Sequence, residues 1–452
     1  MESSVSGSKD PCGSKRAFGG DSRLTSNTSR IGCRTGFSRI KLNLEPSCGA
    51  QIILSWFILR IMATHMLSDL ELLERLVRFN TTTRFSPLPL MDFVCDYLDH
   101  SKIRITRFDC GDGYENIYCE TGPESVSGEG VTLCGHVDTV PADEPDWESD
   151  PWELSVRDGR MYARGCCDMK GFDSIAINTL RRSIDRDLTE PLALLLTHSE
   201  ETGTIGAGHF VDQWPGERVM PKQVLVGEPT SYDAVRAHKG HLTIDLTVCG
   251  APCHTGFPHK GSNAITKSID LMNALEDFRR SLVDERTPES HLFEEVPYPV
   301  FTISRILGGT AINVMPDRCT LKIGIRMLPG QDISRMLKRV HDVVLGAGFR
   351  LSDEGVSGDC IVDVINATPA FGLDEKDPFL RVVLEHARTS SPIGVNYGTD
   401  AGRLANLGCR CVVFGPGDIS QAHRANEWIS CDEFDRASSV VDSIIRKAAT
   451  TP

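Results

Sequence analysis

The 452-residue sequence lacks an apolar run long enough to cross a membrane. A run from Ile52 to Met62 is interrupted by Arg60 and falls short of the roughly 18 residues that a transmembrane helix needs. It also lies too far from the N-terminus for a simple signal peptide, and no small-residue cleavage site is evident. We expect residues 1–61 to be a disordered or non-native extension, with a transit peptide as the alternative, and Met62 or Met66 to be the initiator.

The chain also lacks the marks of a disulfide scaffold and of a nucleotide-binding protein. Its 16 cysteines show no C-x-x-C spacing, and the adjacent pair Cys166-Cys167 is typical of small buried residues in a reducing compartment. No P-loop is present, and residues 203–208 lack the G-x-G-x-x-G spacing of a dinucleotide site. A formal net charge of −14 disfavours binding to nucleic acid or to an anionic membrane, since phosphates would be repelled. We therefore expect a cytoplasmic protein whose partner is a small molecule.

Four short, almost continuously apolar runs predict strands that are covered on both faces. They lie at residues 131–134, 192–196, 224–226 and 411–414. Such strands are typical of a largely parallel, twisted sheet with helices on both faces, so the expected fold class is α/β. Helices are predicted to begin at Ser68, which forms a capping box with Glu71, and after Lys170.

The stretch 238–368 has a different pattern. Apolar and polar residues alternate at 242–248 and at 321–326, which indicates an antiparallel sheet with one face exposed to solvent. An apolar stripe at 333–344 predicts a helix beside it. We expect an α+β domain at 238–368 that is inserted into the α/β domain. The α/β domain would then consist of residues 62–237 and 369–452.

Polar side chains gather directly after the four apolar runs. The segments are GHVDTVP (135–141), HSEET (198–202), GEPT (227–230) and GPGDISQAH (415–423), and RGCCDMKG (164–171) stands at a loop-to-helix junction. In open α/β sheets, ligands bind beyond the carboxyl ends of the strands. The candidate site residues in these segments are His136, Asp138, Asp168, Glu200, Glu201, Glu228 and His423.

Two histidines and several carboxylates form a donor set that suits two divalent ions such as zinc. Paired ions polarise a carbonyl and lower the pKa of water, and an unligated carboxylate is then needed to take the proton. The pair Glu200-Glu201 can supply both kinds of carboxylate, because adjacent side chains point in different directions. Each motif alone has an ordinary explanation, as a surface histidine, a solvated loop or a turn. Their joint placement at strand ends favours the metal site.

In their order along the chain, the five segments resemble the motif series of the aminoacylase and carboxypeptidase family of di-zinc metallohydrolases. The resemblance covers nearly everything from about residue 68 to 450. The resemblance implies two Zn²⁺ ions per subunit, with Co²⁺ as a substitute. It implies that His136 and Glu228 bind one ion and that Glu201 and His423 bind the other. Asp168 would bridge the two ions.

The resemblance also implies roles for residues that do not bind metal. Asp138 would fix the orientation of a ligand imidazole, and Glu200 would be the general base that later donates its proton to the leaving amine. The inserted domain would be a lid through which the chain forms a homodimer. There His254, which follows a cysteine where the family usually has glycine, would reach the site of the partner subunit and stabilise the oxyanion. Asn313 and Arg326 would hold the substrate's carboxylate.

The expected function is therefore metal-dependent hydrolysis of the amide bond between an acyl group and the α-amino nitrogen of an amino acid. Segments 226–241, 397–402 and 415–428 are most similar to the deacylases of the family. The pair His198-Ser199 departs from the Ser-Asp that usually precedes the double glutamate. A dipeptidase of the same family is the alternative. A remote alternative is a non-catalytic binding protein with the same sheet and lid. The presence of all the expected metal ligands and of Glu200 disfavours this alternative.

Overall fold

The computed structural model describes residues 66–448, so the expected extension at 1–61 lies outside the described residues. The described part of the chain forms sheets of nine, five and three strands. Among these residues, no helix combines the length and the apolar character that crossing a membrane requires.

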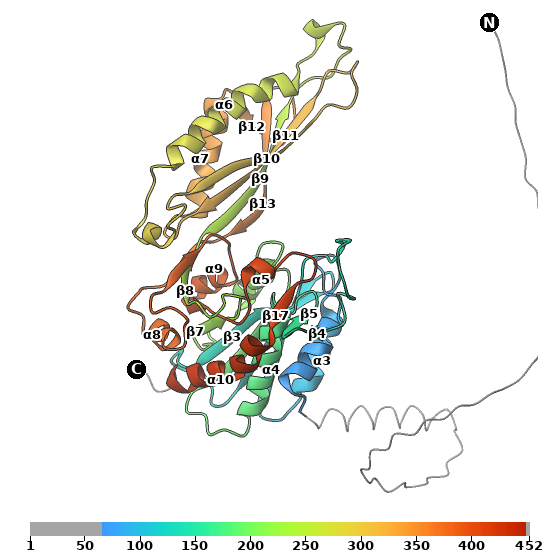
Figure 1. Ribbon diagram of the computed structural model, residues 1–452. Helices are drawn as coiled ribbons and strands as arrows, with labels where there is room; N and C mark the ends of the chain where they lie inside the picture. Colours follow the sequence, from blue (N-terminus) through green and yellow to red (C-terminus); the bar gives the residue numbers. More distant parts are fainter. Residues whose placement is uncertain (1–65, 449–452) are drawn as a thin grey trace, which may run out of the picture. The chain divides into compact units, whose positions relative to one another are not determined.

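The nine-stranded sheet, of which β3, β7 and β8 are labelled in Figure 1, has a parallel centre. In spatial order its strands are β1 (Ile103–Gly111), β2 (Tyr114–Thr121), β6 (Leu192–Thr197), β3 (Val131–His136), β7 (Gln223–Val226), β16 (Arg410–Val413), β8 (Val235–His238) and β14 (Phe371–Gly372), with β15 (Ile393–Val395) paired to β8. Strands β6, β3, β7 and β16 run parallel to one another. Antiparallel pairs β1–β2, β2–β6, β16–β8 and β8–β14 flank them. The α/β class is confirmed, and the sheet is mixed because the β1–β2 hairpin and the strands β8 and β14 extend its parallel centre.

Two groups of helices cover this sheet. The helices are α2 (Asp69–Val77), α3 (Leu88–Leu98), α4 (Lys170–Ser183), α5 (Ile205–Gln213), α8 (Pro378–Leu384), α9 (Ala401–Leu404) and α10 (Cys431–Ala448). Helix α4 packs against β3 and β6 and contacts α2 and α10, whereas α5 packs against β1, β2 and β6 and contacts α9 (Figure 1). The predicted capping box starts α2, where the Ser68 hydroxyl accepts from the Glu71 N–H and the Glu71 carboxylate accepts from the Ser68 N–H.

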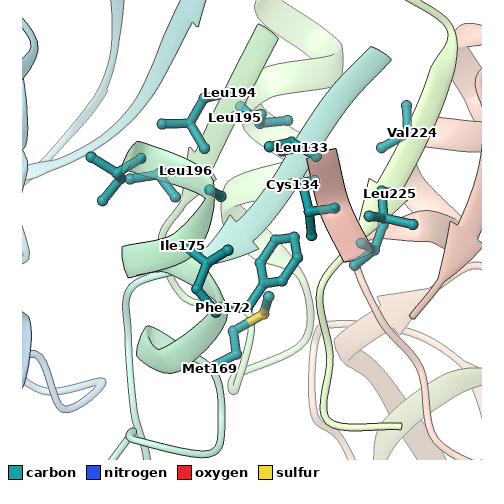
Figure 2. Packing of buried hydrophobic residues seen from close by; sticks show 14 of the residues in the cluster. Leu133, Cys134, Met169, Phe172, Ile175, Leu194, Leu195, Leu196, Val224 and Leu225 are labelled. Carbon is teal, nitrogen blue, oxygen red and sulfur yellow. The ribbon is translucent and has the colours of Figure 1, made fainter. Parts of the chain in front are cut away.

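The core between α4 and the parallel strands explains the apolar runs. Every residue of β3, β6 and β7 is buried. Figure 2 shows Phe172 and Ile175 of α4 beside the side chains of these strands, among them Leu133 and Leu196. Burial of each such side chain contributes about 1.5–3 kcal/mol, so the strands need no polar alternation.

The five-stranded sheet occupies most of the segment expected as an inserted domain. Its strands, in spatial order, are β10 (Val300–Gly308), β11 (Arg318–Met327), β9 (Gly240–Cys249), β13 (Asp359–Thr368) and β12 (Arg350–Leu351), and its helices are α6 (Ala264–Leu282) and α7 (Ile333–Gly346). Alternate residues of β9 and β11 are buried in a separate core with α6 and α7. The predicted antiparallel pairing and the helix beside it are thus confirmed, and only β12 pairs in parallel, with β13. The domain boundaries stay a prediction.

The remaining elements are short. The third sheet consists of β4 (Ser155–Arg157), β5 (Arg160–Tyr162) and β17 (Trp428–Ser430), and the 3₁₀ helices are η1 (Pro258–Lys260), η2 (Pro288–Leu292), η3 (Ala405–Leu407) and η4 (Ile419–Gln421). Pairing between β5 and β17 joins the segment before α4 to the segment after η4. Both of these segments carry candidate site residues.

Candidate metal centre

The parallel centre of the nine-stranded sheet brings four polar segments to one edge. Because β6, β3, β7 and β16 are parallel neighbours, their carboxyl ends lie side by side. His136 is the last residue of β3, and Glu228 closely follows β7. Glu200 and Glu201 come after β6, and His423 comes after β16 and η4. Asp138 also closely follows β3, so six of the seven candidates converge through strand order alone.

Asp168, in the loop before α4, lies between the two histidines. Its Oδ1 is 3.1 Å from Nε2 of His136, and its Oδ2 is 3.3 Å from Nε2 of His423. Nε2 of His136 is also 4.0 Å from Oε2 of Glu228, and Nε2 of His423 is 2.8 Å from Oε2 of Glu201. Asp168 therefore presents one oxygen to each histidine–glutamate pair, as a carboxylate that bridges two ions would.

The donor atoms form two overlapping groups. Ligand atoms of His136, Asp168 and Glu201 lie within 4.8 Å of one another, and so do those of His136, Glu200 and Glu228. Imidazole nitrogen and carboxylate oxygen both suit zinc, so the residues present fit a pair of divalent ions. Glu200 lies as close to His136 as a ligand would, and distance alone does not separate a ligand role from a base role.

Asp138 connects the segment after β3 with the double glutamate. Its Oδ1 accepts a hydrogen bond from the Glu200 N–H (3.0 Å), and its Oδ2 accepts one from the Glu201 N–H (3.1 Å). Nδ1 of His136 is 3.0 Å from the backbone oxygen of Asp138 and 3.6 Å from its carboxylate. Donation from Nδ1 to that oxygen leaves Nε2 of His136 free for a metal. Asp138 thus positions the imidazole through its backbone and both glutamates through its side chain.

Burial concentrates charge in this centre. Burial, together with the charge of a neighbouring carboxylate, raises the pKa of Glu200 well above its ordinary value, and burial and Asp168 raise the pKa of Glu201 to about 7. Burial opposes ionisation of Asp168, but hydrogen bonds with His136 and His423 hold its pKa below the ordinary value. Hydrogen bonds to Asp168 and Glu201 raise the pKa of His423 to about 10. A divalent cation would stabilise these buried carboxylates, because it would supply the positive charge that protons otherwise provide.

Two glycines beside the ligands are required by close packing. A Cβ at Gly135 would lie 2.0 Å from Oδ1 of Asp173, and a Cβ at Gly227 would lie 2.0 Å from the ring of Phe172. Both contacts are far shorter than real side chains show. The glycines in GHVD and GEPT therefore let helix α4 approach the strand ends that carry His136 and Glu228.

Glu427 is a buried residue to which the motifs assigned no role. It accepts hydrogen bonds from the backbone N–H groups of Gly165 (3.0 Å), Cys167 (2.9 Å) and Asp168 (3.1 Å). It also forms an ion pair with Arg164 at 2.8 Å, and both side chains are 1% exposed. Glu427 thereby holds the loop that presents Asp168. The one feature of the sequence that could have indicated this role is the position of Glu427, an acidic residue shortly after the last ligand motif.

Asp400 and Tyr397 also face the centre, and both come from the segment 397–402. Oδ2 of Asp400 accepts a hydrogen bond from the hydroxyl of Thr197 (2.6 Å), and burial raises the pKa of Asp400 to about 6. Burial and the charge of Glu228 raise the pKa of Tyr397. The sequence pointed to this segment by resemblance, but no chemistry marked these two residues as neighbours of the metal ligands.

The three residues expected from the inserted domain are not in the cluster. His254 and Asn313 are exposed and lie near each other, since the Thr255 N–H donates to the backbone oxygen of Asn313 (3.1 Å) and His254 pairs with Val314. Arg326, on β11, is half-buried, and burial lowers its pKa. Within residues 66–448, no hydrogen bond or ion pair links these three side chains to the centre, and no carboxylate pairs with Arg326.

Comparisons with known proteins show which family this chain resembles. The model of the family described as peptidase family M20/M25/M40 matches residues 132–447. An acetylornithine deacetylase from Pasteurella multocida is 34% identical over 325 residues, which cover 71% of this chain and 81% of the relative. Another, from Proteus mirabilis, is 35% identical over 317 residues, which cover 70% and 79%.

A solved structure shows the same fold. It is the M20 family metallo-carboxypeptidase Sso-CP2 from Sulfolobus solfataricus, with a TM-score of 0.69 and 16% identity, covering 85% of this chain and 100% of that chain. The family match spans well over half of this sequence, and the two deacetylases exceed 30% identity over most of it. The chain therefore belongs to peptidase family M20/M25/M40.

Proposed function

We propose that this chain is a metal-dependent amidohydrolase that converts N2-acetyl-L-ornithine to L-ornithine and acetate. One observation carries the proposal: Asp168 directs one oxygen to each of two histidines, and the partly buried pair Glu200-Glu201 lies beside it. The similarity to acetylornithine deacetylases supports the choice of substrate. The segments 226–241 and 397–402, which resemble the deacetylases, also contact each other, because Nε2 of His238 accepts a hydrogen bond from the Thr399 N–H (3.3 Å). This contact supports the same choice.

The proposed cofactor is a pair of Zn²⁺ ions per subunit, with Co²⁺ as a substitute. His136 and Glu228 would hold one ion, Glu201 and His423 the other, and Asp168 would bridge. When bound, the pair would polarise the amide carbonyl of the substrate and lower the pKa of water.

Glu200 would carry the proton. It would take a proton from the attacking water and donate it to the departing nitrogen, because an amine leaves well only when protonated. Asp138 accepts hydrogen bonds from the backbone of both Glu200 and Glu201, which supports this division of roles. The backbone of the pair is held, so one side chain can bind metal while the other faces the water.

Arg326 and Asn313 would bind the substrate's α-carboxylate. A half-buried guanidinium without a carboxylate partner among the described residues suits this task. The planar guanidinium can pair with a carboxylate through two parallel hydrogen bonds.

A homodimer would place His254 at the site of the partner subunit. Apolar side chains near His254 are exposed, with Phe257 52%, Ile312 99% and Val314 39% exposed. Contact with a second copy of the chain would remove this apolar surface from water. The exposed His254 would then supply a positive or hydrogen-bonding group to the oxyanion.

A substrate panel tests the proposal. The protein, loaded with Zn²⁺ or Co²⁺, is assayed with N2-acetyl-L-ornithine, N-acetylcitrulline, N-succinyl-diaminopimelate and dipeptides, and Glu200→Gln serves as the control for contaminating hydrolases. We expect the highest kcat/KM for N2-acetyl-L-ornithine. A dipeptide or another acyl amino acid that is hydrolysed ten times faster would reassign the substrate within the family. If the metal-loaded protein hydrolyses none of these substrates, the alternative of a non-catalytic binding protein is favoured.

A further inference from the structure

A second group of metal-binding side chains lies outside the candidate metal centre. Cys110 is near the end of β1, His198 follows β6, and His209 is on α5. Their ligand atoms all lie within 4.8 Å of one another, and the two imidazole rings are 5.7 Å apart between centroids. We call these three residues the Cys110 cluster. It contains a thiol, whereas the candidate metal centre has only nitrogen and oxygen donors.

The backbone around the Cys110 cluster aims its side chains inward. The register between β1 and β2 shifts between Asp109 and Gly111, so Cys110 lies on a β-bulge, a feature that redirects a side chain. Asn116, a fully buried residue of β2, connects two members of the cluster. Its Nδ2 donates to Sγ of Cys110 (3.6 Å), and its Oδ1 accepts from the N–H of His198 (3.2 Å).

Two imidazole nitrogens in the cluster are buried without a partner. Within the described residues, neither Nε2 of His198 nor Nδ1 of His209 forms a hydrogen bond. His198 is 2% exposed, and its other nitrogen is 2.9 Å from Oγ of Ser199. Buried nitrogens are almost always hydrogen-bonded, because leaving one without a partner destabilises the fold. Two such nitrogens beside one thiol point to a shared ligand.

We propose that Cys110, His198 and His209 form a third metal site, which binds a zinc-class divalent ion. Thiolate and imidazole prefer zinc and similar ions over magnesium or calcium, which take oxygen ligands. Tetrahedral bonds to zinc place donor atoms about 3.5 Å apart, so small rotations of the three side chains are sufficient. Cys110 and His209 are only partly buried, which leaves access for solvent as the fourth ligand.

The site would stabilise the loop that carries the proposed proton carrier. His198 stands two residues before Glu200, so an ion bound there would tie this loop to β1 and α5. The histidine also stands where the family usually has serine, in the pair that precedes the double glutamate. The site is therefore a feature of this chain that the proposed reaction does not require.

Cobalt substitution tests the proposal, because a thiolate bound to Co²⁺ gives a charge-transfer absorption in the near ultraviolet. Metal-free protein is titrated with Co²⁺ alone while absorption and bound metal are measured. We expect the thiolate band and three Co²⁺ per chain. Cys110→Ser should lose the band and bind two, whereas Cys95→Ser, a matched change of another half-buried cysteine, should keep both.

The proposal is overturned if the protein is saturated with Co²⁺ and shows no thiolate band. It is also overturned if the band persists in Cys110→Ser. His209→Gln gives a second measurement if Cys110→Ser does not fold, and should weaken Co²⁺ binding at this site by tenfold or more. An unchanged affinity in His209→Gln would also overturn it. Deacetylase assays on the same samples separate this site from the proposed function. Activity without the band refutes only the third site, and the band without activity refutes only the enzyme.

Discussion

Replacement of Glu200 by glutamine tests the proposed mechanism most directly. The substitution keeps the size of the side chain, and the hydrogen bond from the Glu200 N–H to Asp138 belongs to the backbone, so the loop should keep its geometry. Only the ability to accept a proton is lost. Positioned acid–base catalysis contributes about 10²–10⁴-fold, so turnover should fall by that factor, equivalent to about 3–5 kcal/mol of transition-state stabilisation.

The other readouts of Glu200→Gln distinguish a proton carrier from a metal ligand. KM should change little, because the proposed carboxylate contacts are with Arg326 and Asn313. Elemental analysis should find the parent metal content in Glu200→Gln and a reduced content in Glu201→Gln, whose carboxylate lies 2.8 Å from Nε2 of His423. If Glu200→Gln loses metal while Glu201→Gln keeps it, the two roles are reversed and the reasoning is refuted.

Four further experiments test other parts of the proposal. A chain of residues 62–452 should have full deacetylase activity and an unchanged Tm, because the described fold begins with the capping box; a lower Tm by differential scanning calorimetry would refute this. Inactive His254→Ala and inactive Glu200→Ala subunits, once mixed, should regain partial activity in an assay of the mixed dimers, and mixed dimers without activity would exclude the trans role. Arg326→Lys should raise KM about tenfold or more in steady-state assays and change kcat less, since one bidentate contact is lost; an unchanged KM would exclude the contact. Glu427→Gln should lower the free energy of unfolding in urea by about 1–3 kcal/mol, because buried Arg164 loses the charge of Glu427 and keeps only that of Glu144, and a change below about 0.5 kcal/mol would contradict that reasoning.

The order of the strands was open to prediction only in part. Continuous burial makes the runs at 131–134, 192–196 and 224–226 apolar on both faces, which is a local property that the sequence displays. The antiparallel strands β8 and β14 are short and follow no comparable pattern. Their place in the sheet results from pairing between distant segments, so the prediction of a largely parallel sheet missed the mixed edges.

The candidate site divides in the same way. Strand-end motifs are local, so neighbouring residues in the sequence are sufficient to identify His136, Glu228 and the double glutamate. Glu427 accepts hydrogen bonds from backbone N–H groups that lie more than 250 residues away in the sequence. The residues near Glu427 in the chain therefore give no indication of these contacts. The cluster of Cys110, His198 and His209 likewise joins β1, the end of β6 and α5.

By itself, the sequence determined the α/β class, the alternating second sheet and the candidate metal ligands, because periodicity and donor chemistry are properties of neighbouring residues. Tertiary structure alone decided that Asp168 directs one oxygen to each histidine and that Asp138 holds the backbone of both glutamates. It also brought two imidazoles, each with one buried nitrogen that has no hydrogen-bond partner within residues 66–448, to the same thiol. These are distances between atoms that the chain brings together only when it folds, and no local pattern specifies them.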